Sequence, residues 1–374
     1  MSKIIGGTLL VAGTSIGAAM IAMPITAAKI GFFGSILLMF IVGFVMYYMA
    51  QVHLDIFTIN KKHHSMAKIA GEVIGKKTQV IYSISTLGLL ISLLIAYISG
   101  IGEIVSTISS ISYKTTVLSL VTILFFSLSI SHKLLDYYNR IAFSFKLCVV
   151  SVMALVLAPH VSIDNLIIGS CVSINDLSIL SIMPIFITSF GFHGSIPFIY
   201  KLLDKNANLY RKTTAYGCII TILVYILWLT LTFGVIDYGD LVQSSSGLSE
   251  FILLFKLNSK LLSSSINIFA LLGILTSLFG VIVGIYDFIE GMLTDKRRGI
   301  IAGVTLVFPT IFCLFGNDLF LKALGFAGCA LTIIAIIIPI IIRFKLNGKF
   351  HRMILIISFI IGVITIIGEI MKFL

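Results

Sequence analysis

Uninterrupted apolar runs, each about twenty residues long, follow one another along almost the whole chain. About twenty apolar residues are what a helix needs to cross a bilayer, where every backbone group must be bonded internally. Residues of hydrophobic type make up 59% of the 374, and charged residues only 11%, which leaves too little polar sequence for a separate soluble domain. The runs are also about twice as long as the alternating segments of a membrane β-barrel. We therefore expect an all-α integral membrane protein.

About eleven runs can be distinguished, five of them before a weakly acidic polar stretch at His160 to Ser178 and six after it. They cover Ile4–Ala28, Ile30–Leu54, Val80–Gly102, Thr115–Ser131, Ile141–Pro159, Ile179–Tyr200, Thr213–Ile236, Leu261–Tyr286, Gly299–Phe315, Ala323–Ile342 and Met353–Ile367. The first run is longer than the apolar region of a signal peptide, so we expect it to be a retained span.

Basic residues are distributed unevenly between alternate loops. With a cytoplasmic N-terminus, about 20 of the 26 Lys and Arg residues lie on the cytoplasmic side, as the positive-inside rule requires. The C-terminus is then periplasmic. Because the net charge of +11 follows from this topology, and because no basic face with motif support is present, we expect a membrane protein that binds no nucleic acid. The five Cys residues are odd in number and mostly apolar in context, which indicates free thiols.

Two loops carry helical patterns. Ser65 to Ile74 has a capping residue at its start and Gly75 just beyond its end. Leu248 to Leu262 places apolar residues along one face, which is typical of a lid or interfacial helix and equally of a segment packed against helix ends.

Two of the runs are interrupted at their centres by residues that weaken helices. The first contains Gly13-Thr14-Ser15-Ile16-Gly17 with Pro24 after it, and the sixth contains Ser189 to Pro197 with Pro184 before it. If helices one to five and six to ten are repeats, their odd number makes the second repeat inverted. Paired interruptions at matched positions then indicate a transporter binding site. Unwound amides suit a carboxylate and opposed carbonyls an ammonium group, so we expect a zwitterion such as an amino acid.

Four stretches resemble the hydroxy/aromatic amino acid permease family, and specifically its tyrosine and tryptophan transporters. They are Gly6 to Gly17, Ala96-Tyr97-Ile98-Ser99-Gly100, Thr188 to Pro197 and Asp287-Phe288. The third is highly specific, whereas the first is shared with wider amino acid permeases. Span count and loop pattern match along essentially the whole chain.

The resemblance implies a LeuT-type fold in which an inner-membrane protein imports aromatic amino acids with protons by alternating access. It implies a single transport domain over 1–374, with a first repeat at 1–159, an inverted repeat at 179–342 and an extra C-terminal helix at 351–374. Relatives continue the first-helix motif with Gly where this chain has Ala19.

A specific substrate site follows from these interruptions. We expect the carboxylate on the amides of Gly13 to Gly17, the ammonium on carbonyls of both interruptions including Gly191, and the ring among Tyr97, Phe190 and Phe192. His193 lies between these rings and an imidazole can bond a substrate hydroxyl or indole. A buried neutral His bonded to a freed carbonyl accounts for His193 equally well.

Three residues are candidates for ion coupling. Lys146 lies about one and a half turns inside the fifth run, where it either snorkels to the interface or occupies the place of an ion near the first helix. The latter role, with loss and gain of its proton, is suggested by analogy with proton-driven amino acid transporters. Thr276 and Ser277 resemble the hydroxyl pair of a sodium site, which makes sodium coupling the alternative. Close helix packing also explains these two small residues. We expect no cofactor beyond the proton or sodium gradient, and no obligate protein partner.

Other function classes compete for the same residues. Gly13 to Gly17 also fits the Gly-x-Ser-x-Gly motif of hydrolases, with Ser15 as nucleophile and His193 as base, but that motif requires a strand, a turn and a helix of a soluble sheet. An intramembrane serine hydrolase remains a remote alternative. The sequence contains neither a His-Glu-x-x-His motif, which would predict a metal site, nor a filter sequence, which would predict a channel.

Overall fold

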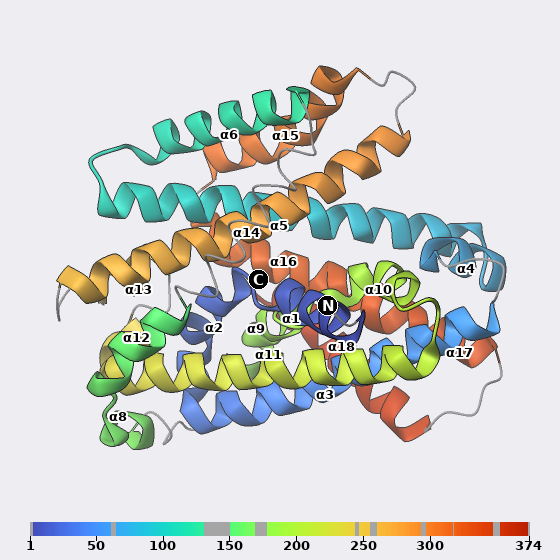
Figure 1. Cartoon of the computed structure of the whole chain (residues 1–374), viewed down its shortest axis with the longest axis horizontal. Helices are drawn as coiled ribbons and strands as arrows, with labels where there is room; N and C mark the ends of the chain where they lie inside the picture. The colour runs from blue at the N-terminus through green and yellow to red at the C-terminus, as the bar shows by residue number, and fades with distance from the viewer. Residues whose placement is uncertain are drawn as a thin grey trace.

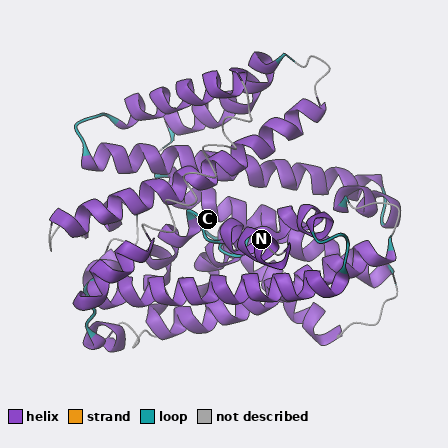
Figure 2. Ribbon diagram, viewed as in Figure 1, coloured by secondary structure: helices purple, strands orange, loops and turns teal. Residues whose placement is uncertain are grey.

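The structure, a computed structural model, describes residues 3–60, 65–130, 150–168, 178–243, 247–254, 260–292, 297–316, 318–346 and 352–372. Within these ranges the chain is helical and has no strand (Figure 2). Nine of the helical segments are long and apolar enough to cross a membrane. The expectation of an all-α membrane protein is thus confirmed.

Figure 1 shows how the helices are arranged. In chain order they are α1 (Lys3–Ser15), α2 (Ala19–Ala27), η1 (Ala28–Ile30), α3 (Gly31–Ile59), α4 (Met66–Val73), α5 (Lys76–Ile108), α6 (Tyr113–Ile130), η2 (Ala158–His160), α8 (Ile163–Ile168), α9 (Ser178–Thr188), η3 (Phe192–Ser195), α10 (Ile196–Leu202), α11 (Ala207–Val235), α12 (Tyr238–Gln243), α13 (Leu248–Leu254), α14 (Lys260–Met292), α15 (Arg298–Phe315), α16 (Leu319–Thr332), η6 (Ile333–Ile337), α17 (Ile338–Lys345) and α18 (Arg352–Ile370).

The predicted run at Ile141–Pro159 lies only partly in the described residues, which show an apolar helix over Val150–His160. The other ten runs each correspond to helical segments in the structure. A count of eleven spans and their division into two repeats stay predictions.

The long helix α5 crosses the centre of the molecule and contacts α16, α14, α6 and α15 (Figure 1). Its buried residues concentrate between Leu94 and Ile104, where neighbours surround it. On the other side, α11 packs beside both α1 and α3. Many apolar side chains of α3, α6, α15 and α18 point outward and remain exposed, among them Phe33, Leu37, Ile123 and Phe315, as expected of a surface that faces lipid.

Helix α9 is held between α16 and α18 by direct backbone contact. A methyl group added at Gly328 of α16 would collide with the Pro184 carbonyl group, and one added at Gly368 of α18 would collide with the Leu180 carbonyl group. Glycine at both positions allows the close approach that small residues give membrane helices. The C-terminal helix α18 is therefore joined to the interrupted part of the bundle.

Two connecting helices test the loop predictions. Helix α4 confirms the one expected at 65–74, although the Ser65 side chain makes no capping hydrogen bond. The helix expected at Leu248 to Leu262 is shorter than predicted, because α13 ends at Leu254 and Leu262 belongs to the long helix α14. The apolar face of α13 is buried through Leu248, Phe251 and Ile252.

Candidate functional site

The first helix is broken where the sequence predicts it. Helix α1 ends at Ser15 and α2 begins at Ala19, so the backbone between them is not α-helical. The last amide before the gap, that of Ile16, still donates to Ala12 O. The amides of Gly17, Ala18 and Ala19 make no backbone hydrogen bond within the described residues. They lie at the N-terminal end of α2, where unbonded donors and the helix dipole favour a negative group.

The sixth predicted run is broken in the same way. Helix α9 ends at Thr188, and a short 3-10 turn over Phe192–Ser195 leads into α10 at Ile196. Gly191 donates to the Thr188 carbonyl, which closes the end of α9. A methyl group at Gly191 would lie 2.8 Å from that same Thr188 oxygen, so glycine is needed for the turn to form.

Tyr225 of α11 joins the two breaks. Its hydroxyl lies 2.9 Å from Ser15 O and 3.3 Å from Ser189 O, the first at the end of α1 and the second just beyond α9. The side chain is fully buried. Carbonyls at helix ends lack intrahelical partners, and one phenol here serves both. The two interruptions are therefore brought together in space.

The first break also contacts α5 and α14. A methyl group at Gly17 would lie 2.6 Å from Ser277 Oγ, so the α14 hydroxyl faces the unwound backbone. Tyr97 of α5 hydrogen-bonds the same Ser277 side chain. Ser277 and Thr276 both donate to Gly273 O, at 3.0 and 3.2 Å. Three residues named from the sequence, Gly17, Tyr97 and Ser277, thus share one locus.

The aromatic residues of the second break are enclosed by protein. Phe190 and Phe192 are fully buried. The Phe190 ring lies 6.1 Å from that of Tyr225, and a methyl group at Gly43 of α3 would lie 3.1 Å from its Cζ atom. Phe190 therefore occupies the α3 and α11 side of the breaks, whereas Tyr97 occupies the α5 and α14 side.

His193 is buried, with 3% of its surface exposed, and its Nε2 lies 3.0 Å from Met46 O of α3. Its ring contacts that of Phe192, at 4.5 Å between centroids, and that of His53 of α3, at 5.4 Å. A bond from a buried His to a backbone carbonyl is the arrangement that the sequence left open as the alternative to substrate binding.

The remaining predicted residues differ in environment. Thr14 is exposed and its hydroxyl donates back to Leu10 O and Val11 O, whereas Ser15 and Ile16 are buried. Gly13 is half-buried at the end of α1. Lys146 lies outside the described residues.

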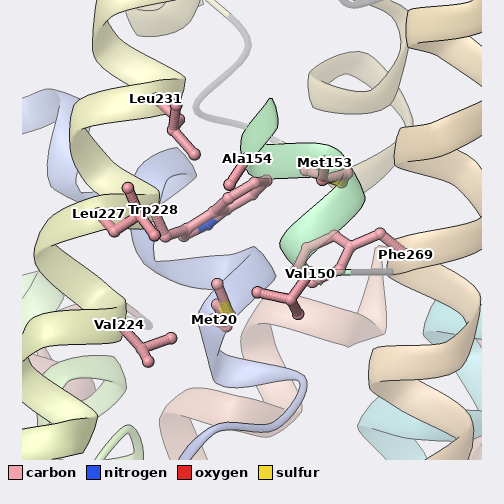
Figure 3. A pocket seen from close by; sticks show the side chains of 9 residues that line it. All are labelled: Met20, Val150, Met153, Ala154, Val224, Leu227, Trp228, Leu231 and Phe269. Atoms are coloured by element: carbon pink, nitrogen blue, oxygen red, sulfur yellow. The ribbon is translucent and has the colours of Figure 1, made fainter. Parts of the chain in front are cut away.

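An apolar pocket lies beside the first break and encloses about 240 Å³ including its open mouth (Figure 3). It is formed by α2, the helix from Val150, α11 and α14, through Met20, Val150, Met153, Ala154, Val224, Leu227, Trp228, Leu231 and Phe269. The Trp228 indole lies 4.9 Å from the Phe269 ring in a tilted arrangement, and its buried Nε1 makes no hydrogen bond. No residue of this pocket was predicted from the sequence, and its lining offers nothing to a carboxylate or an ammonium group except that one N–H.

A charged cluster lies away from the breaks. Asp55 of α3 faces Arg343 of α17 at 3.5 Å and Arg211 of α11 at 3.9 Å. Arg343 is 4% exposed, so this guanidinium is buried, whereas the Asp55 side chain is 24% exposed. The cluster connects three helices near the end of α3.

Sequence reasoning missed Tyr225 and His53. Both lie in apolar runs, where a tyrosine or histidine has no local pattern that distinguishes a bridging role from simple burial. An intramembrane ionisable residue is by itself a functional hypothesis, and that signal could have found His53.

Residues 1–370 match the tryptophan/tyrosine permease family. The tyrosine-specific transport system 1 of Haemophilus influenzae is 32% identical over 360 residues, covering 92% of this chain and 88% of that protein. Glutamine transporter 2 of Aliivibrio fischeri is 27% identical, covering 93% and 90%.

Among solved structures, a manganese transporter of Eremococcus coleocola superposes with a TM-score of 0.67, covering 98% of this chain and 85% of that one. At 14% identity this likeness concerns the fold and not the cargo. The chain belongs to the tryptophan/tyrosine permease family, and it is a multi-pass membrane transporter rather than an enzyme.

Proposed function

We propose that the protein imports an aromatic amino acid, tyrosine or tryptophan, by alternating access in symport with protons. The observation that carries the proposal is the pair of helix breaks joined by the Tyr225 hydroxyl. Backbone left unwound at membrane depth is tolerated where it lines a site. Membership of a tryptophan/tyrosine permease family, together with a tyrosine-specific relative, supports the aromatic substrate.

The substrate carboxylate is assigned to the first break. The amides of Gly17, Ala18 and Ala19 are without backbone partners there, and they begin a helix whose dipole favours an anion. The assignment extends the predicted set from Gly13–Gly17 toward α2. The ammonium group takes carbonyl oxygens at the ends of α1 and α9, which the dipole makes the negative ends.

The substrate ring is assigned to the aromatic side chains around the breaks, Tyr97 on one side and Phe190 and Phe192 on the other. Aromatic pairs in edge-to-face geometry contribute about 0.5–1.5 kcal/mol each beyond burial. His193 completes this group beside Phe192. Reorientation of the buried rings is then part of the step that admits substrate.

Proton coupling is preferred over sodium coupling because the hydroxyls of Thr276 and Ser277 both donate within their own helix, and Ser277 also bonds Tyr97. Sodium needs several oxygen ligands, and sodium dependence is the alternative outcome of the test. Lys146 stays a prediction for the coupling residue.

The topology is proposed as predicted: an inner-membrane protein with a cytoplasmic N-terminus and a periplasmic C-terminus, built from repeats at 1–159 and 179–342 and the additional helix at 351–374. The matched positions of the two breaks support the repeats. A reporter that is active only in the periplasm, fused after residue 374, tests the orientation. An inactive reporter on folded protein would contradict it.

Transport is tested in proteoliposomes loaded with sodium-free buffer. We expect an inward proton gradient to drive accumulation of tritiated tyrosine or tryptophan, with each competing for uptake of the other and glutamine competing weakly. Uptake that appears only with sodium would show that sodium, and not the proton, is the coupling ion. Strong uptake of glutamine with none of the aromatic amino acids would overturn the substrate assignment.

A further inference from the structure

Two buried imidazoles lie in contact beside the second helix break. His53 of α3 and His193 of η3 are 2% and 3% exposed, and their ring centroids are 5.4 Å apart at an interplanar angle of 61°. They lie 140 residues apart in the sequence, so the fold alone brings them together. Buried ionisable groups inside a membrane protein are costly and are a functional hypothesis by default.

The hydrogen bonds of the pair fix the tautomer of each ring. His53 Nδ1 lies 2.8 Å from Met49 O, and His193 Nε2 lies 3.0 Å from Met46 O. A carbonyl only accepts, so each of these nitrogens carries the hydrogen of its neutral ring. The other nitrogens, His53 Nε2 and His193 Nδ1, are buried without a hydrogen bond. Each ring therefore presents one bare basic nitrogen.

A backbone carbonyl near each ring can accept a hydrogen bond from an added proton. The Ile334 carbonyl faces His53 from the π-helical turn η6, and the Phe190 carbonyl faces His193 from the second break. A π-turn inside a helix frequently marks a functional site. A proton on His193 Nδ1 would create a donor toward the Phe190 carbonyl, so protonation acts directly on the backbone of the break.

Other titratable groups lie on the elements packed against the pair, and several of them have partners of their own. On the elements packed against the pair the titratable groups are Lys3, Lys29, Tyr47, Tyr48, Asp55, Tyr200, Lys201, Tyr210, Arg211, Lys212, Tyr216, Cys218, Tyr225, Arg343 and Lys345, while α2, α9 and η6 carry none. Asp55 pairs with Arg343 and Arg211, Lys3 pairs with Asp204, and the Tyr210 hydroxyl bonds Ala50 O.

We propose that His53 and His193 together bind the transported proton. Two imidazolium groups in contact repel each other, so the pair holds one added proton at a time. That proton bonds the carbonyl side of the second break, which couples proton entry to the conformation of the substrate site. The proposal rests on the proton symport proposed above and names its coupling site.

The test separates coupling from transport in one preparation of proteoliposomes. Exchange of external tritiated tyrosine for internal tyrosine at equal pH needs no net proton movement. Accumulation driven by an inward proton gradient, followed with an entrapped pH dye, does need it. The variant is His53→Asn, whose amide keeps a donor for Met49 O and lacks the second basic nitrogen. The matched control is His160→Asn, at an exposed imidazole of η2.

We expect His53→Asn to retain exchange within about twofold, and to lose about tenfold or more of gradient-driven accumulation together with substrate-linked acidification. Its exchange rate should also lose the pH dependence of the unmodified protein. His160→Asn should match the unmodified protein. Unchanged gradient-driven accumulation in His53→Asn overturns the proposal, and so does a parallel loss of exchange and accumulation in folded protein.

Measurements on the unmodified protein distinguish failure of the proposed substrate from failure of proton symport. Absence of tyrosine exchange refutes the proposed substrate, whereas exchange without response to a proton gradient refutes proton symport and this site with it. If His53→Asn does not fold, nitrogen-15 NMR of labelled histidines in nanodiscs replaces it. We expect one Nδ1–H and one Nε2–H buried ring at high pH and a single shared proton at low pH; two independently titrating rings would contradict the pair.

Discussion

A single phenol determines how the two breaks meet. Tyr225 is fully buried, and it donates to carbonyls that close two different helices. Removing a buried hydrogen-bond donor leaves each acceptor with its desolvation cost, about 1–3 kcal/mol. Tyr225→Phe should therefore slow tyrosine uptake by about tenfold or more, measured as initial rate in proteoliposomes, while the ring packing against Phe190 is kept.

The matched control for this change is Tyr216→Phe on the same helix, since the Tyr216 side chain is exposed. We expect it to transport like the unmodified protein. Equal rates for the two variants would show that the shared hydroxyl does not set the geometry of the site.

Gly17 and Ser277 are predicted to be coupled through one contact. A methyl group at Gly17 would lie 2.6 Å from Ser277 Oγ but 3.7 Å from its Cβ, so the clash is with the hydroxyl alone. Gly17→Ala should reduce uptake strongly, and adding Ser277→Ala should restore part of it. A double-mutant cycle is expected to give an interaction energy of about 1–3 kcal/mol. Additive losses would mean that the two residues act separately.

At the scale of elements, the sequence predicts the interruptions well because they are local. Glycine, serine and proline weaken a helix wherever they cluster. Helices α1 and α9 end, and helices α2 and α10 begin, within or next to the predicted stretches. The run lengths of α5, α11 and α14 follow from hydropathy for the same reason, although α14 continues to Met292, beyond the predicted end at Tyr286.

What the sequence could not supply are relations between distant elements. The bridge from α11 to both breaks, the contact of His53 with His193, and the π-helical turn at Ile333–Ile337 each depend on neighbours that no local pattern encodes. The opposite placement of Phe190 and Tyr97 is a further case, because a helix break leaves side-chain directions undefined until packing fixes them.

The second break gives a prediction with an internal control. A methyl group at Gly191 would meet the Thr188 backbone oxygen at 2.8 Å, and backbone cannot yield as a flexible side chain does. Three residues further on, Gly194 is exposed, and nothing lies within 4 Å of a methyl group added there. We expect Gly191→Ala to lower uptake by about tenfold or more and Gly194→Ala to have little effect. Similar uptake by both, at equal amounts of folded protein, would contradict this account of the turn.

At the scale of the whole molecule, Asp55 holds three helices together through Arg343 and Arg211. Because the buried Arg343 guanidinium loses this carboxylate, Asp55→Asn should lower the free energy of unfolding by about 2 kcal/mol, read as a lower melting temperature in detergent. Asp204→Asn removes the exposed pair with Lys3 and should change little, because water screens such pairs. A melting temperature that responds equally to both changes would show that burial of Arg343 is unimportant.

The glycine contacts at Gly328 and Gly368 decide which parts of the transporter turn together. Helices that touch backbone to backbone have no side-chain layer on which to slide, so α9 can tilt only as one rigid block with α16 and α18. Helix α18 then moves together with α9 and α16. A transporter truncated before α18 would lose one of the two helices that hold α9.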